Sequence, residues 1–355
     1  MSVAIILDGV SKVYGDFVAL QSTSFEIKEG EFLTLLGPSG SGKSTILGLI
    51  AGSAAPSAGR ILLGTRDVTN QPARERNIGM VFQNYALMPH MTVFDNVAYP
   101  LTVRRMSSRE IKSKVYGVLE RVGLKGFEHR KPRQLSGGQQ QRVGIARCIV
   151  YSPKIILMDE PLGALDKNMR DQMQEEIKRL HKELATTILY VTHDQEEALN
   201  LSDTVCLMNQ GSVVQMGHPE QLYYAPSQQF AAEFLGESNI IEAQTTDTER
   251  LLKTADGLII RVKAPPSKKG AVKILIRPEK LRCIDPKAGS CVENVIIGTV
   301  DAISFFGGMT RITLRSNGGR VFHAKGISDP VTGLPKRGDA LAFSWEETDM
   351  VLLNP

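Results

Sequence analysis

The sequence predicts an α/β domain built on a mostly parallel sheet, followed by a smaller β-rich domain. Up to about residue 235, short apolar runs alternate with longer segments of helical periodicity, the pattern of a parallel sheet covered by helices. Beyond that point, as in residues 310–315, apolar and polar side chains alternate in short segments separated by turns that contain Gly or Pro, which favours a small barrel-like domain. We therefore predict two domains, residues 1–235 and residues 236–355.

The first domain is expected to hold a buried parallel sheet. Four runs are almost entirely apolar, which suits strands covered on both faces. They are residues 32–36, 155–158, 188–192 and 204–208. Over residues 169–184 apolar side chains recur at helical spacing, with Glu175 and Arg179 as an i,i+4 pair on the other side. Another helix is expected after Ser107, which has capping-box spacing to Glu110.

Composition limits the class of protein. The 355 residues are enough for about two domains of ordinary size, and 42% hydrophobic with 23% charged residues are values typical of soluble globular proteins. The net charge of +4 is small, and basic residues are interspersed with acidic ones, so no nucleic-acid partner is expected. The four cysteines are scattered without a C-x-x-C pair, which favours reduced cytosolic thiols over a zinc site or disulfides.

The sequence also bears on membranes and secretion. The first apolar run is interrupted by Asp8 and has no basic leader, so a signal peptide is not expected. No apolar run approaches the ~18 residues that a membrane-spanning helix needs. If this chain serves a membrane process, we expect another chain to cross the bilayer.

A glycine-rich loop follows the apolar run at residues 32–36 and precedes a helical segment. It matches the phosphate-binding pattern G-x-x-x-x-G-K-[ST]. Its members are Gly37, Pro38, Ser39, Gly40, Ser41, Gly42, Lys43, Ser44 and Thr45. In such a loop, backbone N–H groups and the helix N-terminus bind phosphate oxygens, while Lys43 neutralises charge and Ser44 binds magnesium. A Gly- and Ser-rich loop of another purpose is the alternative, and the flanking strand and helix disfavour it.

Two adjacent carboxylates directly follow the apolar run at residues 155–158. Asp159 is suitably placed to hold hydrated Mg²⁺ beside a bound nucleoside triphosphate. Glu160 brings a second carboxylate to the same edge, where it can orient and polarise an attacking water. An Asp-Glu pair that merely opens a surface loop is the alternative, which the phosphate-binding loop makes the lesser one.

Residues 135–142, LSGGQQQR, resemble the signature of ABC ATPases. Physically, Ser136, Gly137 and Gly138 at a helix start form a second anion-binding N-terminus, and Gln139 belongs to the same motif. The alternative of a generic Ser-capped helix accounts for Ser-Gly-Gly alone and not for the whole octet. The resemblance implies an ABC-type ATPase domain with a helical subdomain, followed by a C-terminal domain of the TOBE type.

The resemblance also implies roles for four further residues. Tyr14 matches the aromatic that stacks on adenine, and Gln83 matches the glutamine that touches Mg²⁺. Asp166 matches the acidic loop that faces the opposing subunit, although a helix-capping aspartate is the alternative. His193 matches the histidine that contacts the γ-phosphate and holds Glu160 and water in place. Together with Lys43, Glu160 and His193 are then the catalytic candidates.

The family mechanism implied by the resemblance requires two copies of the chain. The phosphate-binding loop of one copy closes ATP and Mg²⁺ against Ser136 and Gly138 of the other. The segment between Gln83 and Ser136 resembles the subdomain that receives the coupling helices of a permease. We therefore expect a homodimer, transmembrane permease partners, indirect contact with an extracytoplasmic solute-binding protein, and a peripheral location on the cytoplasmic face of the membrane.

The C-terminal segment narrows the kind of transporter. Residues 276–279, IRPE, and residues 304–307, SFFG, resemble the C-terminal domain of solute-importer ATPases. Residues 194–199 and 234–239 resemble the spermidine/putrescine branch most, with sugar, ferric-iron and sulfate importers as alternatives. Gly144 and Cys148 depart from the alanines of many relatives, away from the phosphate chemistry. A non-transport ABC ATPase is less favoured, because neither a coiled-coil insertion nor a second cassette is present, and the C-terminal domain is a candidate regulatory module.

Overall fold

The computed structural model describes residues 3–266, 269–285, 294–328 and 335–353. It separates into two compact units, Met1–Pro219 and Glu220–Pro355, each of which is described by itself. The first unit contains the predicted phosphate-binding loop, the two carboxylates and the signature octet.

The first unit is built on a six-stranded sheet in the order β10-β9-β3-β8-β7-β6. Its strands are β3 (Phe32–Leu36), β6 (Gly79–Val81), β7 (Ile155–Asp159), β8 (Thr187–Thr192), β9 (Thr204–Asn209) and β10 (Ser212–Gly217). All neighbours pair in parallel except the edge strand β10. The four predicted strands are confirmed, and they are almost wholly buried because both faces of the sheet are covered.

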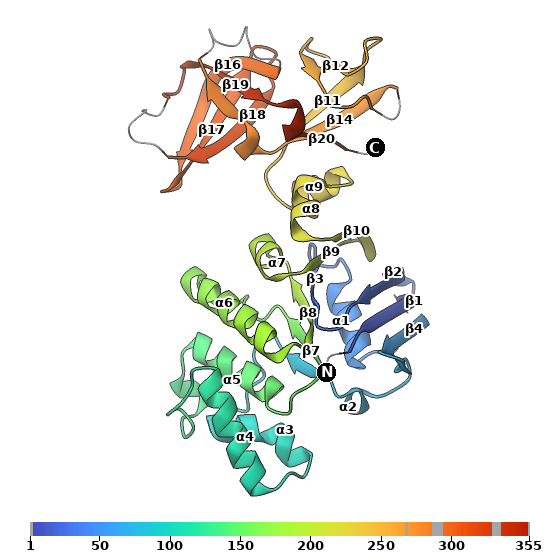
Figure 1. Cartoon of the computed structure of the whole chain (residues 1–355), viewed down its shortest axis with the longest axis vertical. Coiled ribbons are helices and arrows are strands. Elements are labelled where there is room, and N and C mark those ends of the chain that lie inside the picture. The colour runs from blue at the N-terminus through green and yellow to red at the C-terminus, as the bar shows by residue number, and fades with distance from the viewer. Residues whose placement is uncertain (1–2, 267–268, 286–293, 329–334, 354–355) are drawn as a thin grey trace. The chain divides into compact units, whose positions relative to one another are not determined.

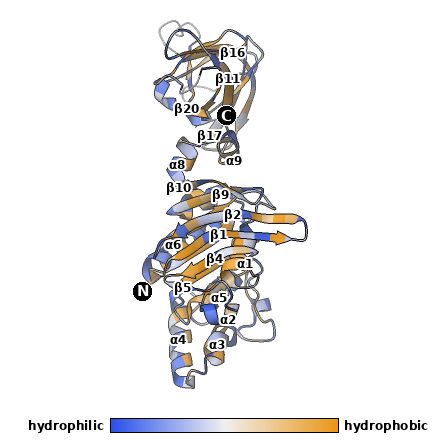
Figure 2. Cartoon of the chain, turned by 90° about the vertical axis from the view of Figure 1, so that its right-hand side faces the viewer, coloured by the Kyte–Doolittle hydropathy of each residue, from blue (hydrophilic) through white to orange (hydrophobic). Residues whose placement is uncertain are grey.

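A second, antiparallel sheet in the order β2-β1-β4-β5 lies in the same unit. Its strands are β1 (Ile5–Tyr14), β2 (Phe17–Ile27), β4 (Ala58–Leu63) and β5 (Arg66–Asp67). Apolar residues run along β1 and β4 (orange in Figure 2), and Ile5 and Leu7 are fully buried. The turn between β1 and β2 places Tyr14 opposite Phe17.

Helices cover both faces of the central sheet. They are α1 (Lys43–Ala51), α2 (Ala73–Arg76), α3 (Val93–Val103), α4 (Ser108–Arg121), α5 (Gly137–Ile149), α6 (Lys167–Leu184) and α7 (Gln195–Leu201). Phe32, Ile156 and Tyr190 pack on the side of α5 and α6, whereas Leu33 and Leu157 pack on the side of α1 and β1. Strand residues therefore alternate between two cores, and α3, α4 and α5 group together as a helical subdomain (Figure 1).

Both predicted helices are confirmed, although Arg179 on α6 pairs with Glu176 and Glu183 and not with Glu175 as expected. The Ser107 hydroxyl accepts a hydrogen bond from the Glu110 N–H, and the Glu110 carboxylate accepts one from the Ser107 N–H, so α4 begins with a capping box. On α6, Met173, Ile177 and Leu180 are buried, as the apolar period predicts. The helix packs through this stripe and leaves its charged side exposed.

The second unit contains two five-stranded sheets, in the orders β13-β12-β11-β14-β20 and β15-β19-β16-β17-β18, among its described residues. The strands are β11 (Asn239–Thr245), β12 (Leu251–Lys253), β13 (Ile259–Arg261), β14 (Ala271–Ile276), β15 (Arg282–Ile284), β16 (Asn294–Phe305), β17 (Met309–Ser316), β18 (Val321–Ile327), β19 (Ala340–Trp345) and β20 (Met350–Leu353). One apolar core joins the two sheets through residues such as Ile274, Leu314 and Phe343. The expected β-rich domain is confirmed.

Two short helices belong to the second unit although they precede residue 236. They are α8 (Pro219–Tyr224) and α9 (Gln229–Phe234). The buried Arg277 guanidinium donates hydrogen bonds to the carbonyl oxygens of Tyr223 and Ala232 at 2.8 Å each and to the Ser238 hydroxyl at 2.8 Å. The two compact units therefore divide at Pro219, earlier than the domain limit predicted at residue 235.

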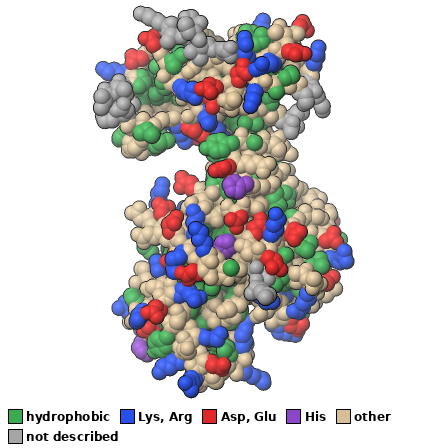
Figure 3. Space-filling view, in the orientation of Figure 1, with side chains coloured by type: hydrophobic (Ala, Val, Ile, Leu, Met, Phe, Trp, Pro, Cys, Tyr) green, Lys and Arg blue, Asp and Glu red, His purple; other side chains and the backbone are tan. Residues whose placement is uncertain are grey.

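The surface of the first unit is mixed in charge. On the face seen in Figure 3, Lys and Arg side chains are interspersed with Asp and Glu over its central part. In the part of the chain that the structure describes, no helix combines the length and apolar character needed to cross a bilayer.

Three of the four cysteines lie in described parts of the chain, and all three are free thiols. Cys148 and Cys206 are buried, and burial raises the pKa of each to about 12, while Cys283 is exposed. Cys291 lies outside the described residues. The two buried thiols are therefore small apolar core groups at neutral pH.

Candidate functional site: a phosphate-binding loop at the ends of parallel strands

The loop between β3 and α1 has a backbone that only glycine can supply at its first position. A Cβ on Gly37 would lie 2.2 Å from the carbonyl oxygen of Met208, far inside van der Waals contact. Gly42 is the N-cap of α1, has a φ of 100°, and offers no side chain to cap the helix. Because no side chain caps α1, its first N–H groups are available to bind an anion, with the positive end of the helix dipole behind them.

Lys43 is folded back onto this loop. Its ammonium donates hydrogen bonds to the carbonyl oxygens of Gly37 at 2.7 Å and Pro38 at 2.9 Å, and the residue is 5% exposed. Burial lowers the Lys43 pKa, whereas the charges of Glu160 and Asp159 act in the opposite direction. The ammonium thus lies within electrostatic reach of both predicted carboxylates and at the centre of the loop.

Asp159 ends β7 and is partly buried. Burial is the main cause that raises the pKa of its carboxyl; the charge of Glu160 raises this pKa further, and the charge of Lys43 lowers it. Ser44 lies exposed in the first turn of α1. The described residues contain no group of three or more His, Cys, Asp or Glu side chains that could hold a metal alone. This donor set fits Mg²⁺, which is typically bound by one or two protein oxygens together with phosphate oxygens and water.

Two side chains converge on one carboxylate oxygen of a third, and the three residues follow three adjacent strands. The Gln83 amide nitrogen donates to Glu160 Oε2 at 3.3 Å, and His193 Nδ1 lies 3.2 Å from the same oxygen. Gln83 follows β6, Glu160 follows β7, and His193 follows β8. The sequence prediction placed these residues around one nucleotide, and the structure brings their side chains together.

Glu160 has an unusual backbone. Its φ is 42°, in the left-handed region that residues with a Cβ seldom adopt. Its N–H donates to the carbonyl oxygen of Val191 at 2.9 Å, which holds the turn against β8. A strained backbone of this kind costs on the order of 1–3 kcal/mol and is commonly found at functional sites. Here it directs the carboxylate toward His193.

The signature residues begin α5 in a capping box. The Ser136 hydroxyl accepts a hydrogen bond from the Gln139 N–H at 3.4 Å, and the Gln139 side chain accepts one from the Ser136 N–H at 3.0 Å. A Cβ on Gly138 would lie 2.1 Å from the Met169 Cε atom. Ser136 and Gly138 line a cavity of about 310 Å³ with residues of α5, α6 and the turn after α4. Among the described residues lining it, none belongs to the phosphate-binding loop.

Tyr14 and Asp166 lie at the margins of the site. Tyr14 ends β1 with its side chain 52% exposed, and the Lys12 ammonium lies 4.7 Å from its ring centroid. Phe17, across the hairpin turn, is 66% exposed. Asp166 is the N-cap of α6 and accepts a hydrogen bond from the Met169 N–H at 2.9 Å. Asp166 therefore does cap α6, which was the alternative interpretation, and its role toward a second subunit stays a prediction.

The sequence reasoning missed a cluster of charged residues next to His193. Asp194 and Glu197, which follow it, contact Arg170 on α6. These residues carry no phosphate-binding motif of their own, and Arg170 precedes Asp194 by more than twenty positions. The only local signal was Asp194 at a helix start, where it caps α7 through the N–H groups of Glu196 and Glu197.

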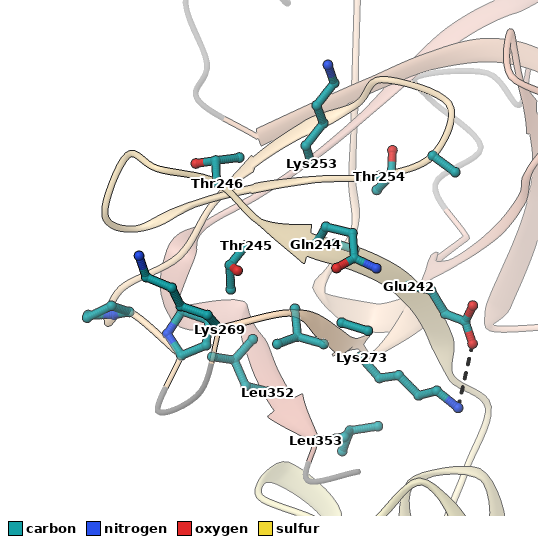
Figure 4. Close-up of a pocket in the computed structure, with 16 residues that line it drawn as sticks. Glu242, Gln244, Thr245, Thr246, Lys253, Thr254, Lys269, Lys273, Leu352 and Leu353 are labelled. Carbon is teal, nitrogen blue, oxygen red and sulfur yellow. Dashed lines mark ion pairs between the residues drawn. The ribbon is translucent and has the colours of Figure 1, made fainter.

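A cavity of about 940 Å³ lies in the second unit, on the sheet formed by β11, β12, β14 and β20. Lys253, Lys269 and Lys273 line it (Figure 4), and the Lys273 ammonium lies 3.6 Å from a carboxylate oxygen of Glu242. In Figure 4 Lys253 and Lys273 point in different directions. The cavity is larger than the one beside Ser136, and among its described lining residues Glu242 is the single carboxylate and no histidine or cysteine is present.

The fold and the site together define a phosphate-loop nucleotide-binding protein. Comparison with family models matches residues 20–163 to the ABC transporter family and residues 274–353 to the TOBE domain. The chain belongs to the ABC transporter family and carries a C-terminal TOBE domain. This family combines the phosphate-binding loop with the signature octet that begins α5.

Curated relatives match nearly the whole chain. A spermidine/putrescine import ATP-binding protein PotA of Rubrobacter xylanophilus is 42% identical over 99% of this chain and 94% of the relative. A PotA of Acetivibrio thermocellus is 46% identical over 86% of this chain and 85% of the relative. An Fe(3+) ions import ATP-binding protein FbpC of Brucella abortus is 40% identical over 99% of this chain and 98% of the relative.

Solved structures of ABC cassettes match about two thirds of the chain. The dimeric structure of MJ0796, a bacterial ABC transporter cassette, is 36% identical with a TM-score of 0.55 and covers 61% of this chain and 98% of that one. The cbiO1 protein of Clostridium perfringens, part of the ABC transporter complex cbiONQ, is 28% identical with a TM-score of 0.59, over 66% of this chain and 93% of that one.

Proposed function

We propose that this chain binds and hydrolyses ATP as the energy-supplying subunit of an ABC importer. The observation that carries the proposal is the convergence of Gln83 and His193 on Glu160 Oε2 beside the loop that holds Lys43. Binding at the carboxyl ends of parallel strands is general in α/β proteins. The curated relatives that match almost the whole chain are named as import ATP-binding proteins, which supports the direction of transport.

Each residue has a chemical role in the proposed reaction. The N–H groups of residues 37–45 and the Lys43 ammonium bind the β- and γ-phosphates, and Tyr14 stacks on adenine. Glu160 accepts a hydrogen bond from the attacking water and orients it in line with the γ-phosphorus. His193 holds the Glu160 carboxylate and contacts the γ-phosphate.

Magnesium is the proposed cofactor. Ser44, Asp159 and Gln83 are the residues that would hold it. Bound Mg²⁺ supplies charge neutralisation to the β- and γ-phosphate oxygens. The pKa of the half-buried Asp159 is raised mainly by burial. A bound cation would therefore stabilise the ionised form of this carboxylate more than it would stabilise a solvated carboxylate.

The proposed working unit is a symmetric homodimer. Ser136, Gly138 and the other N-terminal groups of α5 would contact the γ-phosphate bound to the partner's loop, with Asp166 also facing the partner. ATP then favours the closed dimer, and hydrolysis removes the contact that bridges the two copies. The helical subdomain of α3, α4 and α5 is the proposed docking surface for a permease.

Polyamines are the proposed solute class. The PotA relatives at 42% and 46% identity support spermidine or putrescine, and the FbpC relative at 40% makes ferric iron the main alternative. Solute choice would rest with the permease and with an extracytoplasmic binding protein. The chain itself would be peripheral, on the cytoplasmic face of the membrane.

The test is ATP hydrolysis by the purified chain with Mg²⁺ or with EDTA, compared between wild type and Glu160→Gln. The amide keeps the size of the side chain but removes the carboxylate, so we expect kcat to fall roughly 10²- to 10⁴-fold. Nucleotide binding should remain, and an ATP-bound dimer should accumulate. Phosphate release and analytical ultracentrifugation measure these two quantities.

The matched control is Glu175→Gln, at an exposed position on α6. Its turnover should equal that of wild type. Normal hydrolysis by Glu160→Gln, or hydrolysis that is independent of Mg²⁺, would contradict the proposal.

A further inference from the structure

Arg170 joins two loops that flank the proposed site. It lies in the first turn of α6, and its guanidinium donates to Asp194 Oδ2 at 2.8 Å and to the carbonyl oxygen of Leu165 at 3.3 Å. Leu165 directly precedes Asp166, and Asp194 directly follows His193. One side chain therefore holds the residues next to two of the predicted functional residues.

A buried carboxylate extends this contact into the sheet. Glu197 is 2% exposed and accepts hydrogen bonds from the Tyr190 and Thr192 hydroxyls at 2.8 Å each. Arg170 Nε lies 3.7 Å from Glu197 Oε1, close enough for an ion pair but without a hydrogen bond. Burial raises the pKa of Glu197, while Thr192, Tyr190 and Arg170 favour its ionised form. The arginine thus contacts two carboxylates, those of Asp194, the N-cap of α7, and Glu197 within α7.

The Asp194 carboxylate is held at both oxygens. Oδ1 accepts from the N–H groups of Glu196 and Glu197, at 2.8 and 3.2 Å, and Oδ2 accepts from Arg170. The Asp194 N–H donates to the Thr192 hydroxyl at 3.0 Å. Asp194 is thus held at its backbone and at its side chain, directly after His193, whose Nδ1 lies 3.2 Å from Glu160 Oε2.

The chemistry of the contact requires arginine. A planar guanidinium donates in several fixed directions at once, here to a carboxylate and to a carbonyl oxygen, whereas an ammonium is a single point of charge. The side chains of Arg170 and Asp194 are 29% and 26% exposed, so water only partly replaces a lost contact. Removing the guanidinium would leave the carboxylates of Asp194 and Glu197 near each other without their cation.

We infer that Arg170 is a positioning residue for hydrolysis, which sets His193 against Glu160 and couples it to the Asp166 loop. The inference rests on the proposed function, in which Asp166 faces the partner subunit. Through Arg170, a displacement of the Asp166 loop by the partner reaches the segment that carries His193. Dimer closure and the position of His193 relative to Glu160 are then linked inside each subunit.

The first experiment compares Arg170→Lys and Arg170→Met with Arg179→Met in the full-length chain. Arg179 lies on the same helix and also pairs with two carboxylates, those of Glu176 and Glu183, so it is a matched control. We expect both Arg170 variants to lower kcat about tenfold or more, while the dissociation constant for ATP stays within about threefold. Arg179→Met should change neither quantity.

A double variant tests whether Arg170 acts through His193. If it does, Arg170→Met with His193→Ala should be no slower than His193→Ala alone, because the arginine then has nothing left to position. If the two losses multiply, Arg170 affects turnover by a separate route and the inference is overturned.

Hydrogen exchange separates failure of this inference from failure of the proposed function. In Arg170→Met, amides of residues 163–169 and 193–201 should exchange faster than in wild type and in Arg179→Met, whether or not the chain hydrolyses ATP. Unchanged exchange in both segments would refute the link. An absence of hydrolysis in wild type, with the exchange change present, would refute the proposed function alone.

Discussion

Mixing two inactive variants tests whether Lys43 and Ser136 act on one phosphate from different subunits. Lys43→Ala removes the ammonium at the centre of the phosphate-binding loop. Ser136→Arg places a bulky cation at the N-terminus of α5, with loss of a helix cap that costs about 1 kcal/mol. Each variant alone should be inactive, because both sites of its homodimer lack one essential group.

The symmetry of the proposed dimer gives the magnitude. Random pairing of equal amounts makes about half of the dimers mixed, and each mixed dimer has one intact site of two, so about a quarter of the wild-type sites return if they act independently. The assay is phosphate release at saturating Mg-ATP after the variants are unfolded and refolded together or co-expressed. If both groups served the same chain's nucleotide, every site would stay defective and no activity would return.

A second mixture is the control. Lys43 and Glu160 both belong to the loop-bearing side of one site, since the charge of Glu160 acts on the Lys43 ammonium within one chain. Lys43→Ala mixed with Glu160→Gln should therefore recover nothing. Recovery in this control, or none in the Lys43 and Ser136 mixture, would refute the reasoning that the site is shared between subunits.

Further predictions concern pH, the loop backbone and the second unit. Burial and the Glu160 charge raise the Asp159 pKa. Mg²⁺ should therefore bind with full affinity above that pKa, and the affinity should fall as the pH drops through it, because the protonated carboxyl is a poor ligand. Glu160→Gln removes the neighbouring charge and should move this fall to lower pH in a calorimetric titration. Gly37→Ala should abolish nucleotide binding in an equilibrium assay, since its Cβ meets a carbonyl oxygen at 2.2 Å, whereas Gly40→Ala, with nothing within 4 Å, should cost only about 1–2 kcal/mol of backbone strain. Arg277→Met should destabilise the second unit by roughly 3–5 kcal/mol in denaturant unfolding, because several buried carbonyl oxygens lose their donor, and an unchanged midpoint would contradict this.

The central sheet and the phosphate-binding loop were predictable because their signals are local. The strand that ends at Asp159 is a continuous apolar run, and the loop around Lys43 is a continuous motif with a strand before it and a helix after it. The meeting of Gln83 and His193 at Glu160 followed from a resemblance to known motifs, since residues so far apart along the chain give no local sign of contact.

Other features depended on contacts that no local pattern reveals. The antiparallel sheet formed by β1, β2, β4 and β5 was not predicted. In this sheet β1 pairs with β4, which follows the phosphate-binding loop and helix α1 in the sequence. The compact units divide at Pro219 because α8 and α9 bond to Arg277, whose sequence motif gave no hint of these distant carbonyl partners. The link through Arg170 was missed for the same reason.

The hydrogen bonds of Arg277 have a practical consequence for dissecting this chain. A shortened protein that stops after Leu235 would retain α8 and α9 but lack the guanidinium that satisfies their carbonyl oxygens, together with Leu275 and Leu353, which pack against Ala232. Such a tail would expose apolar surface and unpaired backbone, and it would tend to aggregate. Any loss of transport in that deletion would then reflect a damaged end rather than the missing β-domain, so a cut at Pro219 is the cleaner one.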